Sequence, residues 1–178
     1  MRVFIGIEFP EQFKGSVESL KSEIESQLIK GRFSRIENLH LTLVFIGEIT
    51  VDQVEPLGHM LDQVLATQKC FEMSIDELGT FSKGEQSIVW LGINKGKEHL
   101  FHLSQLLKKE LSSRHYTYDI KPLKPHLTLV RQAKLVQDYV FPVVSFLQRW
   151  KVEKIHLYLS HQVNGILTYE PLHTTHLK

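Results

Sequence analysis

The pentapeptide His-Leu-Thr-Leu-Val occurs twice in this chain, at His40–Val44 and at His126–Val130, and the two copies begin 86 residues apart. At the same offset the apolar stretch Val3–Ile7 aligns with Val89–Ile93, with a glycine at the same place in each. Two separate matches at one offset indicate an internal duplication, in which each half forms one structural unit. A chain of 178 residues is long enough for one domain in which two small lobes share a core.

Helical patterns recur between the repeated blocks. Apolar residues at helical spacing predict four helices, over residues 13–28, 51–65, 100–111 and 135–147. Thr50 is expected to cap the second of them. Pro142 predicts a break or a late start in the fourth, because proline removes a backbone donor from a helix interior.

Alternating apolar and polar residues predict further strands. They are expected over residues 71–75, 152–159 and 166–171. Gly165 separates the last two strands as a hairpin, and Gly84 predicts a turn close to the boundary between the halves. A hairpin requires antiparallel pairing, and no glycine-rich phosphate loop follows a strand, so the sequence disfavours a doubly wound parallel sheet.

These elements predict an α+β fold with two pseudo-symmetric lobes. Each lobe is expected to hold an antiparallel-containing sheet with helices packed outside, and the lobes are expected to face each other across a central cleft. By sequence the lobes span approximately residues 1–84 and 85–178 of one domain covering residues 1–178. The duplicated order of elements also permits strands to be exchanged between the lobes.

The repeated pentapeptide places polar groups on one face of a strand. His40 and Thr42 share one face and the intervening leucines share the other, because successive side chains of a strand point in opposite directions. The same holds for His126 and Thr128. If the leucines pack against the helices, the two His-x-Thr faces can meet across the cleft. A purely structural repeat accounts for the leucines but gives no reason to retain histidine and threonine in both copies.

Two imidazoles and two hydroxyls suit phosphoryl chemistry. Imidazole titrates near neutrality, so one histidine can act as a general base and the other as a general acid. Threonine hydroxyls can donate hydrogen bonds to non-bridging phosphoryl oxygens. Arg131 follows the second copy directly, and an ideal strand would point it away from Thr128. A β-bulge or the end of the strand could bring its guanidinium to the anion.

Composition restricts the other classes of function. With 21 Lys and Arg against 20 Asp and Glu the net charge is +1, which argues against a binder of long duplexes but allows a local anion site. Cys70 is the single cysteine, so an internal disulfide and an all-cysteine zinc site are excluded. His99 and His102 lack a third metal ligand, and His173 and His176 are expected to be solvated.

No segment has the length of a transmembrane helix, and the N-terminal apolar run makes a poor signal peptide because Glu8 interrupts it. We therefore expect a cytoplasmic protein with no membrane partner and no obligate protein partner.

The motifs resemble those of the 2H phosphoesterases, specifically the bacterial and archaeal RNA 2′,3′-cyclic phosphodiesterases, also named RNA 2′,5′-ligases. The resemblance spans nearly the whole chain and rests on five segments: 2–10, 38–48, 79–93, 124–131 and 155–160. Two positions depart from the family pattern. Val44 stands where the family often has lysine, and Gln86-Ser87 stands where it usually has Pro-Arg.

The resemblance implies hydrolysis of an RNA or nucleoside 2′,3′-cyclic phosphate to the 2′-phosphate, without a metal or an organic cofactor. It implies His126 as the general base that activates water and His40 as the general acid, an assignment that the pseudo-symmetry allows to be reversed. Thr42, Thr128 and Arg131 would hold the phosphoryl oxygens. The expected substrates are RNA 3′ ends or small cyclic nucleotides. The alternatives are ligation or cleavage of a 2′–5′ linkage, an RNA-end binding module with negligible turnover, and a purely structural role.

Overall fold

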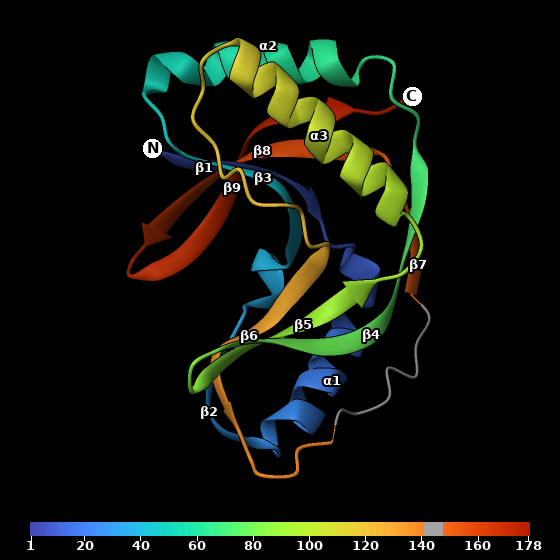
Figure 1. Ribbon diagram of the computed structural model, residues 1–178, viewed down its shortest axis with the longest axis vertical. Coiled ribbons are helices and arrows are strands. Elements are labelled where there is room, and N and C mark those ends of the chain that lie inside the picture. The colour runs from blue at the N-terminus through green and yellow to red at the C-terminus, as the bar shows by residue number, and fades with distance from the viewer. Residues whose placement is uncertain (141–147) are drawn as a thin grey trace.

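The computed structural model describes residues 1–140 and 148–178 and has an α+β fold with two antiparallel sheets (Figure 1). The helices are α1 (Lys14–Glu25), α2 (Val54–Leu65) and α3 (Lys97–Ser113). The strands of the first sheet, in spatial order, are β3 (His40–Glu48), β1 (Arg2–Glu8), β8 (Lys154–Val163) and β9 (Ile166–His176). The strands of the second sheet, in spatial order, are β2 (Leu28–Phe33), β6 (His126–Leu135), β5 (Gln86–Ile93), β4 (Phe71–Lys83) and β7 (Gln148–Val152). Helices α2 and α3 lie over the first sheet and α1 lies against the second.

The two sheets do not follow the order of the halves along the chain. Strand β4 lies before Gly84 yet pairs with β5 in the second sheet, and β8 lies in the C-terminal half yet pairs with β1 in the first. Each sheet therefore combines strands from both halves of the sequence. Exchange of this kind ties the halves together, because neither sheet can form from one half alone.

The strand predicted over residues 152–159 is two strands that belong to different sheets. Val152 pairs with Phe71 in the second sheet, whereas Lys154 pairs with His176 in the first. Glu153 lies between them and belongs to neither strand. A periodic pattern of side chains continues through such a crossing, so alternation alone predicted one strand.

Two of the helix predictions were wrong in part. The first helix ends at Glu25, and residues 28–33 form β2, which pairs with β6. Leu28 continued the helical spacing only because its side chain also packs against the core. Leu135 ends β6 and residues 136–140 are not helical, while residues 141–147 of the fourth predicted helix lie outside the described residues.

The remaining predictions for secondary structure were confirmed. Thr50 and Gln53 form a capping box at the 3₁₀ turn that leads into α2, with the Thr50 N–H donating to Oε1 of Gln53 at 2.9 Å. Gly84 has φ +62° in the turn between β4 and β5, although residues 79–83 belong to β4 rather than to a loop. Gly165 occupies the β8–β9 turn with φ +76°.

The leucines of the repeat form part of the core, as their strand parity predicts. Leu41, Leu43, Leu127 and Leu129 are all buried. Ser104 of α3 donates a hydrogen bond of 2.9 Å to the Leu43 carbonyl, at a residue that has no partner in β1 because of a β-bulge. This bond satisfies a buried acceptor that the ladder leaves open and fixes α3 on β3.

Candidate active site

The two repeated motifs begin equivalent strands in the two sheets. His40 is the first residue of β3 and His126 is the first residue of β6. In each strand the histidine and the threonine are partly exposed, and the leucine after each is buried. The side chains with reactive groups therefore lie on the faces that the core leaves free, where β3 and β6 approach each other.

A β-bulge brings Arg131 to the same face as Thr128. Thr128 pairs with Trp90 of β5 while Val130 pairs with Val89, so β6 has one extra residue at this point. Leu129 and Val130 are consequently both buried, and the alternation is reset by one position. Arg131 then lines the same cavity as Thr128, which an ideal strand would not have allowed.

The equivalent bulge in β3 puts an uncharged residue at the corresponding place. Leu43 and Val44 are both buried, and Phe45 stands 86 residues before Arg131. The Arg2 guanidinium lies 4.9 Å from the centre of the Phe45 ring. The pseudo-symmetry therefore holds for the backbone but not for the charge, which lies on the side of the second motif.

Both histidines are oriented by the same backbone contact. Nδ1 of His40 lies 2.7 Å from the Asn38 carbonyl oxygen, and Nδ1 of His126 lies 2.5 Å from the Lys124 carbonyl oxygen. A carbonyl oxygen can only accept, so Nδ1 carries the proton in both rings and Nε2 is the nitrogen available for chemistry. Nε2 of His40 lies 3.0 Å from Oγ1 of Thr42, whose hydroxyl donates to it in this tautomer.

The environment favours neutral imidazoles. Burial lowers the pKa of His40 to about 4; the bond to Asn38 opposes this shift, and the positive charges of Arg131 and His126 add to it. Burial also lowers the pKa of His126, against the bond to the Lys124 carbonyl, and the charges of Arg131 and Lys124 lower it further. The charge of Arg131 therefore acts on both imidazoles.

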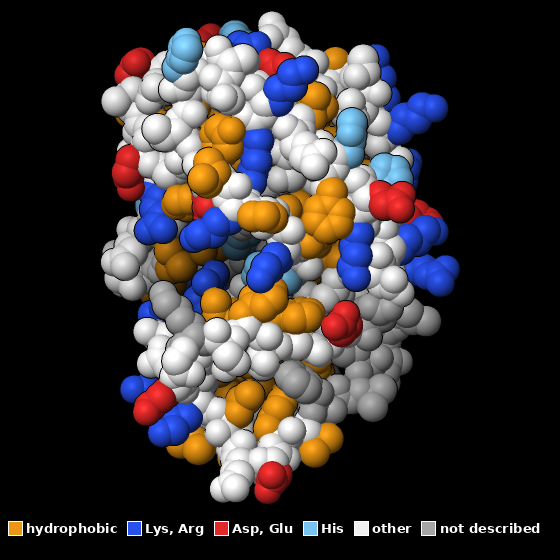
Figure 2. Space-filling view, in the orientation of Figure 1, with side chains coloured by type: hydrophobic (Ala, Val, Ile, Leu, Met, Phe, Trp, Pro, Cys, Tyr) orange, Lys and Arg blue, Asp and Glu red, His pale blue; other side chains and the backbone are white. Residues whose placement is uncertain are grey.

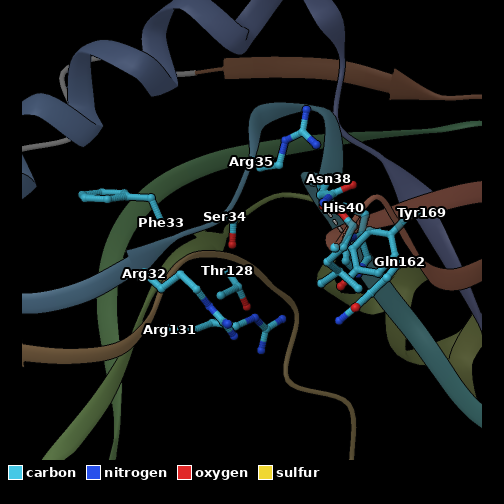
Figure 3. Close-up of a pocket in the computed structure, with 12 residues that line it drawn as sticks. Arg32, Phe33, Ser34, Arg35, Asn38, His40, Thr128, Arg131, Gln162 and Tyr169 are labelled. Carbon is cyan, nitrogen blue, oxygen red and sulfur yellow. Dashed lines mark hydrogen bonds between the residues drawn. The ribbon is translucent and has the colours of Figure 1, made fainter.

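The cavity at this site has a volume of about 390 Å³. Its described lining comes from both sheets and from the segment between β2 and β3: Arg32, Phe33, Ser34, Arg35, Asn38, His40, Thr128, Arg131, Gln162, Gly165, Leu167 and Tyr169. Figure 3 shows Thr128 and Arg131 on one side of the cavity and His40 with Tyr169 on the other. In Figure 2, Lys and Arg side chains surround a hollow at mid-height that contains histidine. Thr42 and His126 are not in this lining. Thr42 is connected to the lining by its hydrogen bond to His40.

Aromatic rings pack around both histidines. The rings of Phe4 and Tyr169 each lie 4.7 Å from the ring of His40, and the edge of Phe81 meets His126 at 5.1 Å. Phe81 in turn contacts Trp90 at 5.0 Å. Packing on several sides restricts the rotation of the His40 imidazole. The His126 imidazole is restricted by Phe81 and by the bond from Nδ1 to the Lys124 carbonyl.

Several cavity residues were not found by sequence reasoning. Arg32 and Ser34 follow the helix predicted over residues 13–28, in a segment for which no element was predicted, and Gln162 and Tyr169 lie on the β8–β9 hairpin, far along the chain from either motif. In the sequence, Gly31 is the residue that could have indicated a strand at β2 closely paired with another strand. A Cβ at Gly31 would lie 2.7 Å from Cγ1 of Val130, so the close pairing of β2 with β6 excludes a side chain there.

The expectation that His173 and His176 are solvated was wrong in part: His176 is exposed, but His173 is only partly exposed. His173 lies in β9, and its Nε2 is 2.9 Å from Oδ1 of Asp62 in α2. Thr175 donates to the same carboxylate oxygen at 2.6 Å. These bonds fasten α2 to the first sheet and have no connection with the cavity.

No three side chains among the described His, Cys, Asp and Glu residues are grouped as metal ligands would be. No described helix is both long enough and apolar enough to cross a membrane.

A family model described as the 2′-5′ RNA ligase superfamily matches residues 9–164. The chain belongs to this superfamily. Two curated relatives named RNA 2′,3′-cyclic phosphodiesterase have similar sequences. The one from Escherichia coli is 28% identical over 163 residues, covering 86% of this chain and 89% of its own length. The one from Thermotoga maritima is 29% identical over 165 residues, covering 85% of each.

Two solved structures have the same fold. The crystal structure of E. coli LigT complexed with 3′-AMP superimposes with a TM-score of 0.84 at 25% identity, covering 99% of this chain and 97% of LigT. Thermus thermophilus TT0787 also gives a TM-score of 0.84, at 21% identity. The match to LigT covers 99% of this chain and therefore extends over both sheets, so the pseudo-symmetric architecture is shared with LigT.

Proposed function

We propose that the chain hydrolyses RNA 2′,3′-cyclic phosphates to 2′-phosphates by general acid–base catalysis with two histidines. The observation that carries the proposal is the equivalent orientation of His40 and His126, each with Nδ1 bound to a carbonyl, in a site that also contains Arg131. The names of the relatives support the choice of substrate, since both are called RNA 2′,3′-cyclic phosphodiesterase.

In this mechanism the cyclic phosphate lies between the two imidazoles. Thr128 and Arg131 bind the non-bridging oxygens, with Thr42 on the side of His40. His126 removes a proton from a water molecule as its oxygen bonds to phosphorus. The bond between phosphorus and O3′ breaks, and His40 gives its Nε2 proton to O3′. The products are a 2′-phosphate and a free 3′-hydroxyl, and the two histidines have exchanged protonation states.

This assignment sets a condition on His40. In the free protein its pKa is about 4, so near neutral pH the imidazole is neutral and its Nε2 has no proton to give. It can act as the acid only if the bound phosphate anion raises this pKa towards the ordinary range. If it does not, the roles of His40 and His126 are reversed, with the rest of the mechanism unchanged.

The test uses a dinucleotide that ends in a 2′,3′-cyclic phosphate, with products identified by ³¹P NMR. We expect a 2′-phosphate. A product with a new 2′–5′ linkage would identify ligation as the reaction. Binding of a 2′-phosphorylated dinucleotide without turnover of the cyclic substrate would identify a binding module and refute the proposal.

A further inference from the structure

A ribbon of basic side chains leads away from the cavity along β2 and β6. Arg32 pairs with Arg131 across these strands, and Lys30 pairs with Lys134 one step farther along. We call these four residues the β2–β6 basic ribbon. Like charges placed directly opposite each other destabilise a sheet, so two such pairs in succession have no value for folding.

Arg32 and Arg131 line the cavity, and Lys30 and Lys134 are exposed next to them along the same two strands. Phe33 and Gly31 point to the opposite face, since Phe33 packs against the core and a Cβ on Gly31 would meet Val130. By alternation, Lys30 and Arg32 point the other way. Figure 3 shows the Arg32 and Arg131 side chains side by side, with their guanidinium groups directed into the same space near Thr128.

Within the described part of the chain, no ion pair neutralises the charges of the ribbon. None of the ion pairs among the described residues involves Lys30, Arg32, Arg131 or Lys134, whereas Arg35 at the cavity pairs with Glu37 at 3.3 Å. The described cavity lining also contains no carboxylate. One cyclic phosphate carries a single negative charge, and Arg131 alone can match it. Three cations therefore remain for further anions.

We propose that the β2–β6 basic ribbon binds the backbone of a single-stranded RNA whose 3′ end occupies the cavity, so that the substrate is an oligonucleotide rather than a mononucleotide. This inference rests on the proposed function for the placement of the 3′ end. Arg131 meets the terminal phosphate, Arg32 the phosphate before it, and Lys30 with Lys134 the one before that. The net charge of +1 is consistent with a small basic surface such as the ribbon, and not with a basic face that binds long duplexes.

The dimensions of the ribbon limit how many phosphates it can serve. Neighbouring strands lie about 4.8 Å apart, so the backbones of Arg32 and Arg131 are separated by about this distance. Lys30 lies two residues from Arg32, which is about 7 Å along a strand. The ribbon therefore accommodates about two phosphates beyond the terminal one, and the benefit of a longer substrate should end at a trinucleotide.

The experiment measures kcat/KM for a nucleoside 2′,3′-cyclic phosphate and for di-, tri- and pentanucleotides with the same end, at several salt concentrations. For the natural sequence we expect kcat/KM to rise at least tenfold up to the trinucleotide and then level off. The slope of log kcat/KM against log salt should be steeper for the trinucleotide by about 1.4, since each single-strand phosphate contact contributes about 0.7.

Two variants and a control test whether the ribbon residues cause the preference for the longer substrate. Arg32→Gln and the double change Lys30→Gln/Lys134→Gln should each reduce the ratio between the trinucleotide and the mononucleotide. Lys109→Gln removes the same charge from an exposed position on α3 and should leave that ratio unchanged. Equal kcat/KM for all lengths, or an equal loss of the ratio in the control, would overturn the proposal.

A binding measurement distinguishes failure of the inferred RNA-binding ribbon from failure of the proposed hydrolase activity. Fluorescence anisotropy with a labelled trinucleotide 2′-phosphate measures the ribbon without any turnover. Weaker binding by the ribbon variants in a protein that hydrolyses no cyclic phosphate would support the ribbon and refute the hydrolase. Unchanged binding by those variants would refute the ribbon, whatever the activity.

Discussion

Phosphate binding should raise the pKa of His40 by several units. In the free protein the pKa lies at about 4, mainly because burial penalises the charged ring, against an ordinary value of 6.5. At about 1.4 kcal/mol per pKa unit, the site disfavours protonation by about 3.5 kcal/mol. A phosphate anion about 4 Å away, at an effective dielectric constant of about 20, attracts the protonated ring by about 4 kcal/mol. The attraction is the larger of the two, so the complex should hold His40 protonated near neutral pH.

The lowered pKa of His40 also makes the folded state less stable as the pH falls. The pKa of His40 is lower in the folded state than in the unfolded state, so its contribution to stability is present above about pH 6.5 and is lost as the pH falls towards 4. His156 is buried, bonds to Thr174 at 2.9 Å and also has its pKa lowered to about 4, so it acts over the same range. Replacing His40 with glutamine should therefore flatten the loss of stability between pH 6.5 and 4 without abolishing it.

Histidine-selective ¹³C NMR tests this reasoning directly. The Cε1–H signal of His40, assigned by its absence from His40→Gln, is followed against pH with and without a nucleoside 2′-phosphate. We expect a midpoint near 4 in the free protein and one above 6 in the complex. A free-state midpoint near 6.5 would refute the argument from burial. A midpoint that stays near 4 in the complex would refute the assignment of His40 as the acid.

Three further predictions address the rest of the site and its support. Arg131→Lys should raise KM for the cyclic phosphate roughly tenfold, measured by steady-state kinetics, because lysine loses the bidentate contact; an unchanged KM would remove Arg131 from the anion site. Gly79→Ala would put a Cβ 2.1 Å from Cζ2 of Trp90 and should lower the free energy of unfolding by about 1–3 kcal/mol in a denaturant titration. Gly15→Ala, on α1 with no atom within 4 Å, should instead raise it by about 0.5–1 kcal/mol, and a similar loss in both variants would contradict the packing argument. EDTA should leave kcat unchanged, and loss of activity that returns with added metal would contradict the mechanism.

The sequence predicted the parts of the fold that depend on local periodicity. The helices over residues 51–65 and 100–111 and the hairpin at Gly165 needed only spacing and turn residues. The pairing of strands could not be read in the same way. The chain changes sheets at Glu153 without any break in alternation, and β4 joins the second sheet through contacts that no repeat encodes.

At the site, the duplication identified the histidines and threonines but not their surroundings. The position of Arg131 depends on a bulge opposite Val89 and Trp90, and a bulge changes strand parity without a mark in the sequence pattern. Arg32 was missed because the predicted helix ended at Leu28 and no element was predicted for the rest of β2. Its role emerges only from its pairing with Arg131 across two strands.

The rate constants of His40→Ala and His126→Ala test the central claim most directly. Both variants are assayed on a nucleoside 2′,3′-cyclic phosphate, and affinity for the 2′-phosphate product is measured in parallel to show that the cavity is intact. The two-histidine mechanism predicts that each variant loses roughly 10²–10⁴-fold in kcat, the usual contribution of one general acid or base. Hydrolysis at nearly the original rate by either variant, with the product still bound, would contradict it.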